Sequence, residues 1–178
     1  MSRVLRLACR LAAVAAPAAP SLLAAQEPGP TVAPKACAAP EHRQFDFWIG
    51  EWEVTTPNGA PAGRNRIESI LDGCALRESW TGAKGGSGNS YNAYDRQSGR
   101  WHQTWVDNGG LVLRLDGTFA GGRMVLSGET RDSSGAPVLN RITWQATAPG
   151  AVRQLWETSR DGGGTWSVVF DGRYRRRG

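Results

Sequence analysis

The chain has 178 residues, with 21 Lys and Arg against 16 Asp and Glu. Much of the basic excess lies near the two ends, in Arg3, Arg6 and Arg10 and in the run from Arg175 to Arg177. Because no basic stripe crosses the rest of the sequence, the charge does not indicate a nucleic-acid partner.

Residues 1–25 have the composition of a secretory signal peptide. A basic start leads into "LAAVAAPAAPSLLAA", an Ala-rich apolar run, and the small residues before Gln26 offer a cleavage point. Pro17 and Pro20 within this run argue against a retained membrane-spanning helix. We therefore expect an exported protein, periplasmic or extracellular, with no membrane span.

Residues 26–40, "QEPGPTVAPKACAAP", are rich in Pro and Ala and predict a flexible lead-in to one folded domain over residues 41–178. Signal cleavage would leave Cys37 and Cys74, an even count that predicts a disulfide in an oxidising compartment, although two free thiols are the alternative. His42 and His102 are the two histidines, and no C-x-x-C pair is present. We expect neither a metal site nor a cofactor.

A short helical turn is expected in "EHRQFDFWIG", and about ten strand-like runs follow it, separated by turns such as "PNG", "DNGG" and "DGGG". The runs cover residues 51–56, 65–71, 75–82, 90–97, 100–107, 111–119, 123–132, 138–147, 151–160 and 165–176. The turns are too short for the helical crossovers of a parallel sheet. The fold class predicted is all-β, a single up-and-down antiparallel β-barrel, with a sandwich as the alternative.

Alternation within these runs predicts which side chains face the interior. "RWHQTWVD" places Trp101, Gln103 and Trp105 on one face and His102 on the other. The patterns "ESW", "QTW" and "QLW" thus repeat one arrangement on three strands, a polar side chain beside a Trp. Their six residues, Glu78, Trp80, Gln103, Trp105, Gln154 and Trp156, are the predicted ligand-binding residues. Since an unpaired buried polar group costs about 1–3 kcal/mol, the repetition favours an aromatic cavity with hydrogen-bonding groups.

Two other interpretations stay open at this point. The amides could pair with each other or with Asn65, Ser69 and Asn140, in a filled barrel that acts through its surface. Glu78 could be the acid or base of a lyase, isomerase or hydratase, because burial raises a carboxyl pKa, or it could be paired with Arg66, Arg77 or a neighbouring amide. No catalytic residue is assigned, and the oligomeric state is not predicted. The same alternation also places Leu71, Trp166 and Val168 inside.

"GEW", Gly50–Trp52, opens the first strand and resembles the G-x-W motif of the calycin superfamily, which includes lipocalins and fatty-acid-binding proteins. The resemblance implies that Trp52 lies at the closed end of the barrel, with an Arg from the last strand packed over it. In "DGRYRRR" that cation would be Arg173 or Arg175, in a cation–π contact.

The stretches "FDFWIGEWEV", "GRNRIESILDGCALRESWTG", "YDRQSGRWHQTWVD", "RQLWE" and "DGRY" are similar to a bacterial exported family of unknown function with a calycin-like barrel. This resemblance implies the fold but hardly any activity. Nitrobindins, ten-stranded relatives, hold haem through a histidine near the C-terminal end of the barrel. No histidine follows His102 in this chain, so haem is not expected.

"SRDGGGTW", Ser159–Trp166, matches the Asp-box pattern of sialidases and other propellers. In that motif the Asp side chain binds loop amides and the Trp packs beneath the loop, with no catalytic role. One copy cannot supply a propeller, so the motif predicts a stable hairpin.

Overall fold

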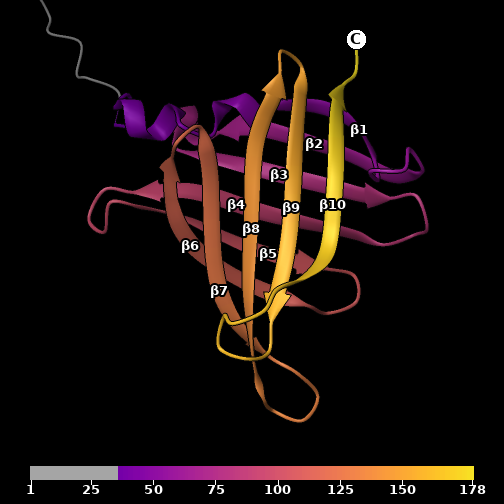
Figure 1. The fold of residues 1–178 in the computed structure, drawn as a ribbon. Coiled ribbons are helices and arrows are strands. Elements are labelled where there is room, and N and C mark those ends of the chain that lie inside the picture. Colours follow the sequence, from indigo (N-terminus) through magenta and orange to yellow (C-terminus); the bar gives the residue numbers. More distant parts are fainter. Residues whose placement is uncertain (1–35) are drawn as a thin grey trace, which may run out of the picture. The chain divides into compact units, whose positions relative to one another are not determined.

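A computed structural model describes residues 36–178, in which ten antiparallel strands close into a barrel. Each strand pairs with its neighbours in sequence, and the last pairs with the first (Figure 1). The predicted all-β up-and-down barrel is therefore confirmed. Residues 1–25, the expected signal peptide, and most of the expected lead-in lie outside the described residues.

The strands begin and end within a few residues of the predicted runs. They are β1 (Gly50–Thr55), β2 (Pro61–Ile70), β3 (Ala75–Gly82), β4 (Ser87–Asp95), β5 (Arg100–Asp107), β6 (Val112–Ala120), β7 (Arg123–Arg131), β8 (Pro137–Ala148), β9 (Ala151–Ser159) and β10 (Ser167–Arg176). Three short 3₁₀ helices accompany them, η1 (Pro40–Arg43), η2 (Asp46–Trp48) and η3 (Leu71–Gly73). The first two form the helical turn expected before the first strand.

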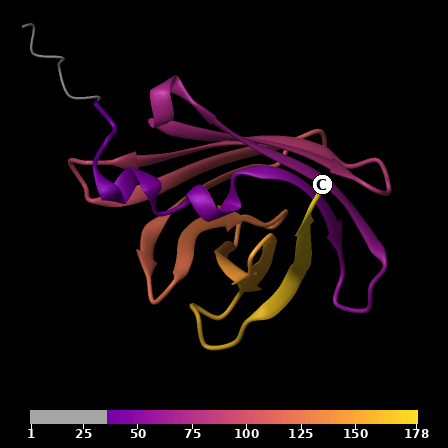
Figure 2. The same ribbon diagram turned by 90° about the horizontal axis from the view of Figure 1, so that it is seen from above.

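One end of the barrel is closed by η1 and η2, which lie across it beside the end of β10 (Figures 1 and 2). Phe45 and Trp48 from this segment are fully buried, and their rings stack with centroids 4.9 Å apart. Phe45 also meets Trp101 and Trp144 edge to face, at 5.6 and 5.2 Å. Each such aromatic pair contributes about 0.5–1.5 kcal/mol of stability beyond the contribution of the apolar area that it buries. The aromatic cluster is therefore a stable plug.

Trp52 belongs to this closed end, as the calycin resemblance implied. It is 1 % exposed and donates from Nε1 to the carbonyl oxygen of Trp48 at 2.9 Å. The cation over its ring is Arg176, at 4.8 Å, and not Arg173 or Arg175 as predicted. The reason is strand parity: Tyr174 points inward, so Arg173 and Arg175 on either side of it point outward, and Arg176 lies opposite Trp52. The barrel as a whole is compatible with a calycin-like fold.

The predicted disulfide between Cys37 and Cys74 is confirmed. It ties the segment that precedes η1 to the start of β3, across a sequence separation of 37 residues. The closing plug is thus held covalently as well as by packing.

The alternation places Trp101 and Gln103 inside and His102 outside, as predicted. It was wrong for Leu71 and Val168, which are 71 % and 61 % exposed. Leu71 falls after the end of β2, in η3, where its φ is +52°. Val168 precedes a β-bulge, which pairs it with Glu157 while Phe170 pairs with Trp156, so one extra residue reverses the parity.

Trp166 was also assigned to the interior, and this was wrong. It lies in the hairpin before β10, with Arg141 stacked at 4.0 Å over its ring. The hairpin itself has the Asp-box arrangement: Asp161 accepts from the Thr165 amide at 2.9 Å, and the Trp166 indole donates to the Gly163 carbonyl at 3.1 Å. The predicted hairpin is confirmed.

Candidate ligand cavity

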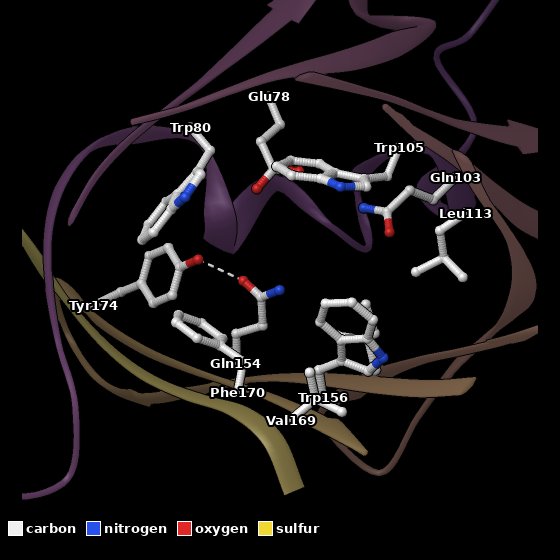
Figure 3. A pocket seen from close by; sticks show the side chains of 11 residues that line it. Glu78, Trp80, Gln103, Trp105, Leu113, Gln154, Trp156, Val169, Phe170 and Tyr174 are labelled. Atoms are coloured by element: carbon white, nitrogen blue, oxygen red, sulfur yellow. Dashed lines mark hydrogen bonds between the residues drawn. The ribbon is translucent and has the colours of Figure 1, made fainter. Parts of the chain in front are cut away.

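A cavity of about 230 Å³ lies inside the barrel, on the side away from the aromatic plug. Its lining comes from six strands and consists of Glu78, Trp80, Gln103, Trp105, Leu113, Ile142, Gln154, Trp156, Val169, Phe170 and Tyr174 (Figure 3). All six residues that the repeated polar–Trp pattern singled out are among them. The structure therefore brings together side chains from β3, β5 and β9 that lie far apart in sequence.

The indoles of Trp80 and Trp105 lie along the barrel wall because each faces a glycine on the next strand. A Cβ added to Gly63 would come within 2.7 Å of the Trp80 ring, and one added to Gly88 within 2.3 Å of the Trp105 ring. Phe170 meets Trp80 edge to face, with centroids 5.8 Å apart. Since these glycines leave room beside the wall, the large rings line the interior without filling it.

Glu78 is the charged group of the cavity, and it is 4 % exposed. Its Oε1 accepts from Asn65 Nδ2 at 2.7 Å, and its Oε2 accepts from Ser90 Oγ at 2.6 Å. Burial raises the pKa of Glu78 to about 6, although both hydrogen bonds act to lower that pKa. Its partners are thus neutral groups.

The two arginines considered as partners of Glu78 lie elsewhere. Arg66 and Arg77 both pair with Glu68, at 2.9 and 2.6 Å, in an exposed cluster. Glu68 and Arg66 are two residues apart on β2, so their side chains point to the same face. Arg77 on β3 lies directly opposite Glu68, so all three side chains share the outer face of the barrel.

The hydrogen bonds of Glu78 continue across the barrel in both directions. On one side Ser90 accepts from Asn92 Nδ2 at 2.9 Å, and Asn92 Oδ1 accepts from Gln103 Nε2 at 2.8 Å. On the other side Asn65 also donates to Tyr174 Oη at 3.2 Å, and Tyr174 in turn donates to Gln154 Oε1. A single polar chain therefore links β5, β4, β3, β2, β10 and β9.

Ser90, Asn92 and Tyr174 belong to this chain, and sequence reasoning did not select them as site residues. All three are buried, Ser90 and Asn92 at 0 % exposed and Tyr174 at 3 %. The signal that could have identified them is the same alternation, because Ser90 and Asn92 share a parity within "NSYNAYD" and Tyr174 stands between outward arginines. Burial, and then the charge of Glu78, raises the pKa of Tyr174 well above its ordinary value, so it stays a hydroxyl donor.

The two amide side chains of the lining each keep hydrogen-bonding capacity for the cavity. Gln103 uses its Nε2 within the chain of hydrogen bonds, and Gln154 uses its Oε1. Within residues 36–178, Gln103 Oε1 and Gln154 Nε2 make no hydrogen bond, and both side chains extend into the space between the rings (Figure 3). The two amides thus offer the cavity one free acceptor and one free donor. Trp156 Nε1, by contrast, donates to Asn140 at 3.0 Å.

No other charged side chain joins Glu78 in the lining, which has no Lys, Arg or His. Within the part of the chain that the structure describes, no group of three or more His, Cys, Asp or Glu is placed to hold a metal ion. None of the helices over residues 36–178 has the length and apolar character needed to cross a bilayer.

Comparison of the sequence with models of known protein families and with curated proteins gives no match. The cavity itself is therefore the feature that points to a function, through its aromatic walls, the buried Glu78, and the two amides that face the open space.

Proposed function

We propose that the protein is an exported binding protein that holds a small, partly apolar molecule inside its barrel. The observation that carries this proposal is the cavity of about 230 Å³, in which three Trp residues meet Glu78, Gln103 and Gln154. Ligand sites combine mostly apolar walls with a few placed polar groups, and the volume of this cavity lies just below their usual range of about 300–1,000 Å³, so its ligand is small. Export is supported by the disulfide and by the signal-like composition of residues 1–25.

A barrel filled throughout would not leave such a space. The aromatic plug shows what full packing of this barrel achieves, with Phe45, Trp48 and Trp144 all at 0 % exposed. On the other side of the barrel, Trp80, Trp105 and Trp156 are only partly buried. This difference favours a ligand over a purely structural interior.

Native mass spectrometry of the protein purified from its own host tests the proposal. We expect a bound mass beyond that of the polypeptide, lost on denaturation. Val169→Trp should abolish it, because Val169 lines the cavity and, at 50 % exposed, can accept a larger side chain without unfolding the barrel. Val168→Trp is the matched control, since Val168 is 61 % exposed and does not line the cavity. A bare polypeptide mass in the wild type, or equal loss in both variants, would contradict the proposal.

A second candidate is an enzyme of the lyase, isomerase or hydratase type. It is favoured by Glu78, whose pKa of about 6 suits a group that accepts and returns a proton near neutral pH. The carboxylate lines the cavity, so a bound molecule would lie within its reach. Chemical conversion of the molecule identified by mass spectrometry, lost in Glu78→Gln, would establish this function, and recovery of that molecule unchanged would exclude it.

A further inference from the structure

The cavity surrounds one carboxylate with aromatic rings. Trp80, Trp105, Trp156, Phe170 and Tyr174 supply the rings, and the Glu78 carboxylate points into the space between them (Figure 3). The face of an aromatic ring carries partial negative charge and attracts cations, most strongly for Trp and where water is excluded. Rings of this kind around a carboxylate form a site of negative potential.

Glu78 has no countercharge within the barrel. Its two oxygens accept from an amide and a hydroxyl, at 2.7 and 2.6 Å, and the lining includes no Lys, Arg or His. Buried charges in proteins are normally paired, because an isolated charge loses its hydration. A cation in the cavity would supply the missing partner, whereas an anion would meet repulsion that the low dielectric of the interior strengthens.

The remaining polar atoms fit a ligand that carries a second, neutral group. Gln103 Oε1 can accept a hydrogen bond and Gln154 Nε2 can donate one, so a hydroxyl or a carbonyl on the ligand finds a partner. At about 230 Å³ the space admits only a small molecule.

We infer that the cavity selects a small organic cation, an amine or quaternary ammonium compound, over neutral and anionic molecules of the same shape. This inference rests on the proposed function, since it names the ligand class of the same cavity. Its physical basis is the combination of aromatic faces with the one unpaired carboxylate, not the volume alone.

Three compounds of nearly equal shape separate charge from size: choline, its uncharged carbon analogue 3,3-dimethylbutan-1-ol, and the anion 3,3-dimethylbutanoate. Binding is followed at pH 8 by two-dimensional NMR, through the indole N–H signals of the lining Trp residues. We expect choline to bind about tenfold or more tightly than the alcohol, and the carboxylate not to bind.

Glu78→Gln should remove this preference, lowering choline affinity about tenfold while leaving the alcohol unchanged. Glu129→Gln is the matched control, because Glu129 is an exposed carboxylate on the outside of β7, paired with Arg131 at 3.7 Å. It should keep the preference in full. If Glu78→Gln does not fold, the wild type at lower pH gives the same information.

Lowering the pH to 5 should protonate Glu78 and so lower the affinity for choline about tenfold, with no change in the affinity for the alcohol. The groups that face Glu78 from the neighbouring strands are Asn65, Ser90 and Tyr174. Of these only Tyr174 titrates, with a pKa well above its ordinary value, so among the groups that line the cavity Glu78 alone changes charge in this range.

Equal affinity for choline and the alcohol would overturn the inference and leave the proposed function standing, since the cavity would still bind. Loss of the preference in Glu129→Gln as well would also overturn it. A neutral or anionic molecule retained from the host, with no signal shift from choline, would do the same. No shift from any of the three compounds, together with a bare polypeptide mass, would overturn both the inference and the proposed function.

Discussion

Phe45, Trp48 and Trp144 at the closed end pack ring against ring, with centroids 4.9–5.4 Å apart. Within the described residues, the indole nitrogens of Trp48 and Trp144 are buried with no hydrogen-bond partner. Trp80 and Trp105 instead lie along the barrel wall beside Gly63 and Gly88, around a chain of hydrogen-bonded polar groups. The closed end is densely packed and leaves two indole nitrogens without a hydrogen bond. The cavity is less densely packed, and its interior contains hydrogen-bonded polar groups. We learn from this that the strand alternation sets which side chains enter the barrel, while the glycines and the helical segment decide whether they fill it.

The largest effect should come from Trp52→Ala at the closed end. We expect the free energy of unfolding to fall by about 3–5 kcal/mol, because the change removes a fully buried indole, its hydrogen bond to Trp48 and the surface under Arg176. Urea denaturation measures this loss. Trp80→Ala, on the partly buried wall of the cavity, should cost clearly less, and an equal cost would break the contrast between the two ends.

Removing the disulfide should cause the next largest loss of unfolding free energy. In the chain-entropy description, closing a loop of 37 residues stabilises the fold by about 3–4 kcal/mol. Cys37→Ser with Cys74→Ser should lower the unfolding free energy by that amount, measured by denaturation without reductant. Addition of reductant should destabilise the wild type to the same level and leave the double variant unchanged. A wild type insensitive to reductant would contradict the assignment of this stability to the disulfide.

The buried Glu78 should make the free energy of unfolding depend on pH. Its pKa is about 6 in the folded protein against an ordinary value of 4.5, so the folded state holds the proton more tightly. The stability from this group is complete below pH 4.5 and is lost as pH rises through about 6, a change of about 2 kcal/mol.

Glu78→Gln has no such proton to lose, so its stability should not fall through this window, and above pH 6 it should exceed that of the wild type. Thermal unfolding at pH 4 and pH 8 of the wild type, Glu78→Gln and the exposed control Glu129→Gln makes the comparison. The control should follow the wild type. Parallel curves for the wild type and Glu78→Gln would show that Glu78 is not a buried charge.

The smallest effect should come from Gln103→Leu. This change removes the donor to Asn92 Oδ1 and leaves that oxygen buried with one partner fewer, which should cost about 1–2 kcal/mol of unfolding free energy. Thr104→Val, one residue along and on the outer face, is the matched control and should change stability by only a few tenths of a kcal/mol. An equal effect of the two variants would show that the chain of hydrogen-bonded side chains does not stabilise the barrel.

Much of the barrel followed from the sequence, because short runs with two-residue alternation leave few other folds. Six of the eleven lining residues were found for the same reason, because "ESW", "QTW" and "QLW" each place a polar side chain and a Trp at the same parity. Val168 was misplaced because a bulge adds one residue at Val169, and no local pattern marks a bulge between Val168 and Phe170. Arg176 could have been chosen over Arg173 and Arg175 by parity, had alternation been carried to the end of the strand.

The partners of Glu78 could not have been chosen from the sequence in the same way. Asn65 and Ser90 are in reach because β2 and β4 flank β3 with the register that places both opposite or beside Glu78, and register depends on the turns and bulges of the whole barrel. The hydrogen bond of Asn65 to Tyr174 spans 109 residues. Only closure of the ring brings these two side chains together.

The pairing of β1 with β10 also has a consequence for how the chain folds. Nine of the ten strand pairs join neighbours in sequence, whereas this one brings Arg176 to the carbonyl of Ile49, 127 residues away. Contacts between neighbouring strands form quickly, and contacts that close a long loop form slowly, because the chain must give up more conformational entropy before the contact is made. The hairpins can therefore assemble in order from either end, but the ring stays open until the last strand has been synthesised. A chain that ends before β10 keeps two unpaired strand edges exposed, those of β1 and β9.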